Sequence, residues 1–335
     1  MGGFNMELFD LIEKLTAIHG PSGREAAVAQ AISELAKPYA DELTTDTLGN
    51  LIVHKKGTGP KLMFSAHMDS IGLVATYLED NGMIRFGKLG GVQPKQIRNV
   101  PVRFENGTAG TVKVDGKADE NNLTLDDLYL DIGAASREEA AALVKLGDTA
   151  VYATQTAKAG RRVISPYLDN RVSCAILLLA LKRLKESKND LYFVFSVQEE
   201  VGLRGAKTAA YGVDPDFAVA VDVTGVCDWP GAPKTSSAVL GGGAAIKIMD
   251  ASIICHTAMV EKLTALAQAG NIKHQMHVTT GGGTDAGVIH QSRLGVVTGV
   301  VAIPCRYTHT PTEMVDLSDV SACVELVTAL AQSKL

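Results

Sequence analysis

The chain has 335 residues, of which 46% are apolar and 21% are charged, and its formal net charge is −5 at pH 7. This length and composition allow one large domain or two moderate ones with a substantial core, and the negative charge gives no electrostatic reason to bind nucleic acid. No apolar run approaches the roughly 18 residues that a membrane-spanning helix needs.

Two helices and two strands are predicted before residue 70. Apolar residues recur on one helical face over residues 7–19, and Gly20-Pro21 should end that helix. Ser22 and Glu25 have the spacing of a capping box, which predicts the start of a second helix. Short strands are expected at 51–54 and 62–66.

Residues 70–160 differ from the preceding residues in their sequence pattern. Asn-Gly or Asp-Gly dipeptides at 81–82, 106–107 and 115–116 separate short stretches that are rich in Val, Ile and Thr. These dipeptides are typical of tight hairpins. A brief helix is expected after Ser136, which begins an S-x-x-E pattern. The segment predicts a small β-rich, barrel-like unit.

Strands and helices alternate from residue 161 onward. Helices are predicted at 172–184, at 257–269 and from Ser318, with strands at 191–197, 217–223 and 297–303. This alternation predicts a mostly parallel, mixed sheet sandwiched by helices. We therefore expect an α/β catalytic domain formed by residues 1–69 and 161–335, with residues 70–160 as an inserted β-rich domain.

Residues that can bind metal ions follow the predicted strands. Ligands in open α/β sheets bind beyond the carboxyl ends of the strands, so these side chains should converge. Unpaired charges beside a buried strand cost several kcal/mol in order of magnitude, and divalent cations would compensate them. Mixed imidazole and carboxylate ligands suit zinc, cobalt or manganese. The residues are His67, Asp69, Glu199, Glu200, Asp222 and His309, with Asp169 just before a predicted helix.

Each of these features has a simpler interpretation by itself. An H-x-D pattern is usually an accident of surface or core, a Glu pair is usually a solvated turn, and an Asp after a strand often only caps a helix. Their joint occurrence at strand ends favours the metal site. Glu199 and Glu200 should point to opposite sides, so one can bind metal while the other acts as a general base. Asp69 can hold the second ring nitrogen of His67.

Six motifs extend over nearly the whole chain. They are AHMDSIG (66–72), SPYLDNR (165–171), QEEVGLRGA (198–206), AVDVT (220–224), GGGTDAG (281–287) and THTPTE (308–313). In their order and spacing, they resemble the tetrahedral (TET) aminopeptidases, which are the glutamyl or deblocking branch of the dinuclear metallo-exopeptidases. QEEVGLRGA together with GGGTDAG is the most specific part of the resemblance.

The resemblance implies a role for each site residue. Glu199 would be the base that takes a proton from a metal-bridging water, whose hydroxide attacks the peptide, and Asp69 would orient His67. Two divalent ions per subunit, Zn²⁺ or Co²⁺ with Mn²⁺ as a further option, would serve peptides with a free N-terminus. The insert would form dimers, which assemble into hollow dodecamers. One ion would be held by His67, Asp169 and Asp222, and the other by Asp169, Glu200 and His309, with Asp169 bridging.

The glycine-rich motif GGGTDAG lacks the lysine and the spacing of a phosphate-binding loop. A loop that lets the main chain approach a substrate is the favoured interpretation. Gly282, Gly283, Thr284 and Asp285 are therefore candidate substrate-binding residues, although a structural role is favoured for Asp285.

Other functions stay open. An amino-acid deacylase or a carboxypeptidase could use the same metal site, and a non-catalytic assembly scaffold is a further alternative. A glycoside hydrolase needs two carboxyl groups roughly 5–10 Å apart across a sugar, which adjacent glutamates do not provide. The sequence does not choose the preferred N-terminal residue, the metal, or between a dimer and a dodecamer.

The cysteines bear on the compartment. There are five, with no C-x-x-C pair, which argues against a disulfide framework and a zinc knuckle. The N-terminus also lacks the pattern of a signal peptide. We therefore expect a cytoplasmic protein.

Overall fold

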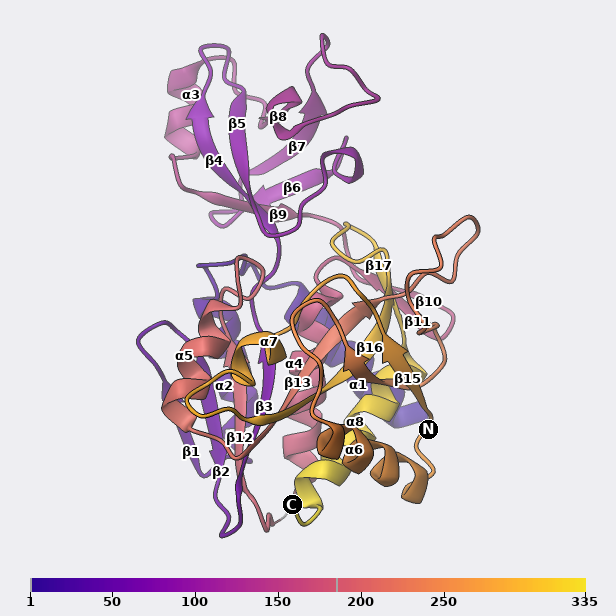
Figure 1. The fold of residues 1–335 in the computed structure, drawn as a ribbon. Coiled ribbons are helices and arrows are strands. Elements are labelled where there is room, and N and C mark those ends of the chain that lie inside the picture. The colour runs from indigo at the N-terminus through magenta and orange to yellow at the C-terminus, as the bar shows by residue number, and fades with distance from the viewer. Residues whose placement is uncertain (1, 185) are drawn as a thin grey trace.

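Two sheets organise the fold, one above the other (Figure 1). The computed structural model describes residues 2–184 and 186–335, with side chains from Met6 onward. Within these residues, one sheet has 11 strands and the other closes into a barrel. Helices flank the large sheet, so the predicted α/β class with a barrel-like β-rich unit is confirmed.

The large sheet is mixed. Its four central strands, β12, β3, β13 and β16, run parallel to one another. The flanking strands pair antiparallel, except that β15 runs parallel to β14. The prediction of a mostly parallel sheet therefore applies to the centre, where helices connect the strands. In sheet order the strands are β1 (Glu42–Thr45), β2 (Leu51–Lys55), β12 (Asp190–Ser196), β3 (Lys61–His67), β13 (Phe217–Gly225), β16 (Val297–Arg306), β17 (Glu313–Asp316), β11 (Arg162–Ser165) and β10 (Ala157–Ala159), with β14 (Ala244–Met249) and β15 (His274–Val278) beside β16.

Helices cover both faces of this sheet. Side chains alternate along β3, so Leu62 and Phe64 join the core beside α4 while Met63 packs with the residues of α5. None of the described helices is long and apolar enough to cross a membrane. One face carries α4 (Leu168–Arg183) with α1 (Gly2–Thr16), α2 (Ala26–Ala36), α6 (Thr257–Ala269) and α8 (Leu317–Gln332), and the other carries α5 (Arg204–Val213) and α7 (Ala286–Ile289).

The barrel has the strand order β4-β5-β8-β7-β6-β9. Hairpins at Gly82 and Gly107, both with positive φ, confirm two of the predicted turns. Ser136 caps the predicted short helix by accepting the Glu139 amide. The elements of the barrel unit are β4 (Gly72–Leu78), β5 (Ile84–Leu89), η1 (Pro94–Gln96), β6 (Pro101–Phe104), β7 (Ala109–Val114), η2 (Leu125–Asp127), β8 (Leu128–Asp131), α3 (Arg137–Leu143) and β9 (Thr149–Tyr152).

The expected tight hairpin at Asp115-Gly116 is wrong. The strands on either side of it, β7 and β8, do pair antiparallel, but a long loop that includes η2 connects them. A turn forms locally because the Asp115 side chain accepts the amide of Lys117. The chain then continues to a capping box at Thr124, which starts η2.

Two predictions near the N-terminus are also wrong. The first helix ends at Thr16 and not at residue 19. The buried Arg171 guanidinium donates to the carbonyl of Leu15, which a helix to residue 19 would have used, and to those of Ile18 and Gly20 in the loop that follows.

The predicted capping box is absent, and α2 begins only at Ala26. The Ser22 hydroxyl donates instead to Asp69, and Glu25 accepts the amides of Gly23 and Gln198. Both side chains therefore hold loops at the edge of the sheet rather than a helix end.

Candidate metal centre and active site

The predicted metal-binding and catalytic residues lie together at the carboxyl edge of the large sheet. The central strands are parallel and end at the same edge, so residues far apart in sequence meet there. His67 ends β3, Asp222 lies in β13, Asp169 is in the first turn of α4, Glu199 and Glu200 follow β12, and His309 follows β16.

His67 and Asp222, which we call the strand half of the site, are carried by strands. The His67 side chain is 2% exposed, and its Nε2 lies 3.1 Å from Asp169 Oδ1 and 3.7 Å from Asp222 Oδ1. Imidazole nitrogen and two carboxylate oxygens thus face one another in a nearly closed space.

Glu200 and His309, which we call the loop half, lie on loops beyond the strands. His309 Nε2 is 3.2 Å from Glu200 Oε2 and 3.3 Å from Asp169 Oδ2. The His309 side chain is 33% exposed, far more than that of His67. The two oxygens of the Asp169 carboxylate therefore face different imidazoles, one in each half.

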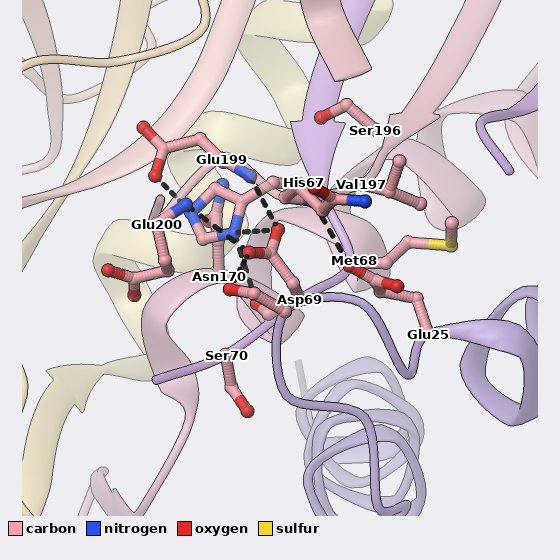
Figure 2. Close-up of polar contacts among 12 residues, drawn as sticks. Glu25, His67, Met68, Asp69, Ser70, Asn170, Ser196, Val197, Glu199 and Glu200 are labelled. Carbon is pink, nitrogen blue, oxygen red and sulfur yellow. Dashed lines mark hydrogen bonds and ion pairs between the residues drawn. The ribbon is translucent and has the colours of Figure 1, made fainter. Parts of the chain in front are cut away.

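The side chains of Glu199 and Glu200 diverge (Figure 2). Glu199 Oε2 lies 3.9 Å from His67 Nε2, whereas Glu200 reaches His309. Glu199 also lines the cavity described below, so its carboxylate is open to a ligand. This divergence leaves one carboxylate available for metal and the other for proton transfer.

Asp69 lies beneath these residues and is fully buried. Its carboxylate accepts the main-chain amides of Glu199, at 3.0 Å, and Glu200, at 3.2 Å, and the Ser22 hydroxyl at 2.6 Å. His67 Nδ1 lies 3.4 Å from the same carboxylate and 3.1 Å from the Asp69 carbonyl oxygen. Asp69 thus touches both glutamates as well as the histidine, which is more than the sequence indicated.

The buried carboxylates of the site favour positive charge next to them. Burial opposes protonation of both imidazoles, but the surrounding carboxylates raise the pKa of His67 well above its ordinary value and that of His309 to about 12. Burial raises the pKa of Asp222 to about 6 and that of Glu199 well above the usual range. The clustered carboxylates therefore stabilise the protonated, positively charged form of both histidines. Metal ions bound at the same place can supply this positive charge instead.

The donor set fits two divalent metal ions. Each half of the site, together with Asp169, provides one imidazole nitrogen and two carboxylate oxygens within 4.8 Å of one another. Glu200 Oε1 is buried and has no hydrogen-bond partner among the described residues, as expected of an oxygen that awaits a cation. Nitrogen and oxygen donors in these numbers suit zinc, cobalt or manganese.

A cavity of about 920 Å³ opens over these side chains. Trp229 and Tyr307, whose ring centroids are 5.6 Å apart, form part of its wall. Val226 and Cys227 add another part of the lining. The cavity is thus large enough for a short peptide segment next to the ligands.

The glycine-rich motif divides between the cavity and the core. Gly282 and Gly283 line the cavity, as expected of a main chain that approaches a ligand. Thr284 and Asp285 are buried and do not appear among the lining residues. The Asp285 carboxylate accepts the hydroxyls of Ser65 and Ser196 beneath the strand ends. This position matches the structural role that the sequence favoured for Asp285 over a substrate contact.

Sequence reasoning missed several residues at the site. Glu313 ends the motif THTPTE and accepts the main-chain amides of Asp169 and His309. The signal available in the sequence was that Glu313 is an acid in the same motif as the candidate ligand His309. Lys247 lines the cavity and pairs with Asp250 at 2.7 Å, and no sequence pattern marked this pair.

A loop of the barrel also reaches the site. A Cβ atom at Gly91 would overlap the His309 ring, and one at Gly90 would lie 2.9 Å from Glu200 Oε2. The main chain after β5 therefore packs directly on the loop half. The Gly-Gly pair was the available signal.

An α/β sheet with imidazoles and carboxylates gathered at its carboxyl edge, below a cavity, defines a hydrolase of the metallopeptidase class. The family profile of the M42 glutamyl aminopeptidases matches residues 49–326. A protein of Acetivibrio thermocellus is 45% identical over 322 residues, which are 96% of this chain and 97% of that protein. The chain therefore belongs to the M42 glutamyl aminopeptidase family and is an aminopeptidase.

Solved structures agree in fold. The aminopeptidase APDkam598 from the archaeon Desulfurococcus kamchatkensis has a TM-score of 0.95 at 38% identity, covering 98% of this chain and 95% of that chain. The TET1 peptidase of Pyrococcus horikoshii, described as able to assemble into a tetrahedron or a large octahedral shell, has a TM-score of 0.89 at 34% identity, covering 97% and 99%.

Proposed function

We propose that the protein is a dinuclear metal-dependent aminopeptidase that releases N-terminal residues from peptides. The observation that carries the proposal is the placement of Asp169, whose two carboxylate oxygens lie 3.1 Å from His67 Nε2 and 3.3 Å from His309 Nε2. One carboxylate between two sets of ligands is the arrangement that a pair of ions requires.

The two halves of the site would each hold one ion, Zn²⁺ or Co²⁺ with Mn²⁺ as a further option. Bound there, the ions would polarise the scissile carbonyl and lower the pKa of a water molecule. Asp169 would be shared between them. The strand half would use His67 and Asp222, and the loop half Glu200 and His309.

Glu199 would act as the general base. Its carboxylate lines the cavity and is not a member of either group of potential metal ligands. Burial raises the pKa of Glu199 well above its usual range, which favours uptake of a proton by its carboxylate. It would accept a proton from the attacking water and donate it to the departing amine.

The side chains of the cavity provide no available cation for the carboxylate of a peptide C-terminus among the described residues. Four carboxylates line it, and Lys247 is the one Lys or Arg among its described lining residues. That ammonium is already paired with Asp250 at 2.7 Å. A carboxypeptidase would need an available cation for the C-terminal carboxylate. The carboxylates also converge on imidazoles instead of lying across a sugar site, which disfavours a glycoside hydrolase.

Hydrolysis of one short peptide, free and N-acetylated, tests the substrate. Protein stripped of metal and resupplied with zinc, cobalt or manganese should release residues from the free N-terminus alone, as read by mass. Removal of the acetyl group would identify a deacylase, and trimming from the other end a carboxypeptidase. No turnover with any metal would favour a non-catalytic assembly scaffold.

Replacement of the base tests the mechanism. Glu199→Gln should bind metal as the wild type does while its activity falls by several orders of magnitude, roughly 10²–10⁴-fold. Metal bound per subunit and turnover should be measured on the same preparation. Retained turnover would remove Glu199 from this role.

We also propose that residues 70–160 form a dimerisation domain inserted between residues 1–69 and 161–335, and that dimers build a dodecamer. The similarity to a TET peptidase that forms closed shells supports this. Five free cysteines support a reducing, cytoplasmic location. Light scattering of the intact protein, and of a variant with a disrupted barrel surface, would test the assembly.

A further inference from the structure

Glu313 is a buried acid that joins two segments of the site. It is the first residue of β17, and it is 1% exposed. Its Oε2 accepts the main-chain amide of Asp169 at 2.9 Å, and its Oε1 accepts that of His309 at 2.8 Å. Both oxygens are thus occupied by N–H donors, and Glu313 belongs to neither group of potential metal ligands.

The two amides that Glu313 holds lie in irregular backbone. His309 has a φ of +64°, in the left-handed region, and Asp169 has non-helical φ and ψ within the first turn of α4. For His309, a residue other than glycine, this left-handed conformation costs roughly 1–3 kcal/mol and persists only where the surroundings impose it. His309 lies outside the strands and helices, so the Glu313 carboxylate that accepts its amide is one of the contacts that hold this conformation.

Asp69 and Glu313 repeat one arrangement on two sides of the site. Asp69 accepts the amides of Glu199 and Glu200, and Glu313 accepts those of Asp169 and His309. Each carboxylate therefore orients a pair of site residues through main-chain donors rather than through their side chains.

The chemistry requires a carboxylate at this position. Two converging N–H donors need two acceptor oxygens, and the two oxygens of a carboxyl group meet them here. A glutamine would present one oxygen and one NH₂ group, and the NH₂ would face an amide N–H. A buried N–H without an acceptor costs about 1–3 kcal/mol, so one of the two segments would shift.

We infer that Glu313 is a positioning residue that sets the distance between Asp169 and His309 and thereby the affinity of the loop half for its metal ion. The inference rests on the proposed dinuclear function. Glu313 touches neither metal nor substrate. Its effect passes through the main chain of Asp169 and His309. The loop half would lose the orientation of both ligands, whereas the strand half shares only Asp169 and keeps the ladder pairing that holds His67 and Asp222.

Metal binding by Glu313→Gln tests the inference. Bound cobalt per subunit should be measured after equilibrium dialysis at graded free Co²⁺, together with the visible absorption of the bound ion. The wild type should bind two ions. The variant should bind the ion of the loop half roughly 10–100-fold more weakly, the usual effect of losing a residue that orients a ligand. The ion of the strand half should lose clearly less affinity, because only one of its ligands, Asp169, depends on Glu313. The activity of the variant should return at high cobalt.

Glu325→Gln, on the exposed face of α8, is the matched control and should bind both ions as the wild type does. If Glu313→Gln does not fold, Glu313→Asp retains both oxygens with a shorter reach and should show the same selective weakening. Unchanged binding of both ions, or equal weakening of both without rescue by cobalt, would overturn the inference. A wild type that binds a single ion would instead refute the dinuclear proposal, and the role of Glu313 would fall with it.

Discussion

The strand half and the loop half of the site are held in different ways. His67 and Asp222 lie in β3 and β13, where they are paired with Ser196 and Ala302 of the neighbouring strands. Their side chains are 2% and 7% exposed. His309, by contrast, lies beyond the end of β16 with a left-handed backbone and a side chain that is 33% exposed. The sheet positions one half of the site directly, while the other half depends on contacts from elsewhere.

Those contacts come from two parts of the molecule. Glu313 holds the His309 main chain from strand β17, which lies next to β16 in the sheet. The barrel loop packs on the other side, where Gly91 leaves no room for a side chain beside the His309 ring. The comparison teaches that the barrel is part of the architecture of the candidate site, because one of its loops limits where the His309 imidazole can lie.

Among the changes that test this comparison, the largest effect is expected from Asp69→Asn, which should weaken both halves together. The asparagine side chain has a single acceptor oxygen, so one of the buried N–H groups of Glu199 and Glu200 would lose its acceptor. This loss costs about 1–3 kcal/mol of unfolding free energy. The substitution would also remove the carboxylate beside His67 Nδ1. Activity and the affinity for both ions should therefore fall by up to roughly 100-fold relative to the wild type. Thermal unfolding and cobalt binding would measure the two effects.

Asp10→Asn, on the exposed side of α1, is the control for that substitution and should leave both quantities unchanged. Selective loss of a single ion in Asp69→Asn would contradict the hydrogen-bond pattern, since the Asp69 carboxylate contacts residues of both halves.

A smaller and more selective effect is expected from Gly91→Ala. The added methyl group would overlap the His309 ring, so the second ion should bind about 10-fold more weakly while the first is unaffected. Gly116→Ala, also in the barrel, meets no atom within 4 Å and should behave as the wild type. Equal binding by both variants would show that the barrel loop does not constrain His309.

The smallest effect concerns the wild type during metal removal. Because His309 is much more exposed than His67, a chelator should remove the ion of the loop half first. Cobalt absorption followed after addition of a chelator should decay in two phases whose rates differ by a few-fold. A single phase would mean that exposure does not govern release and that the two ions leave together.

Much of the fold could be read from local patterns. The helix predicted at 257–269 is α6 with the same bounds, and the predicted strand at 217–223 lies within β13. These segments carry strong apolar periodicity, which tertiary contacts reinforce. The capping box at Ser22 failed because a buried carboxylate, that of Asp69, competes for the hydroxyl. The strands β17, β11 and β10, on one side of the large sheet, are short and carry little pattern of their own.

The sequence alone determined which residues could meet at the site, because parallel strands bring their carboxyl ends to one edge whatever the details of packing. That rule placed His67, Asp222 and the Glu pair next to one another. Only the tertiary structure decided the roles of Glu313 and Gly91. Glu313 reaches an amide 144 residues away in the chain, and Gly91 belongs to a separate sheet. Contacts of this kind follow from how separate elements pack in space, which no local pattern of residues encodes.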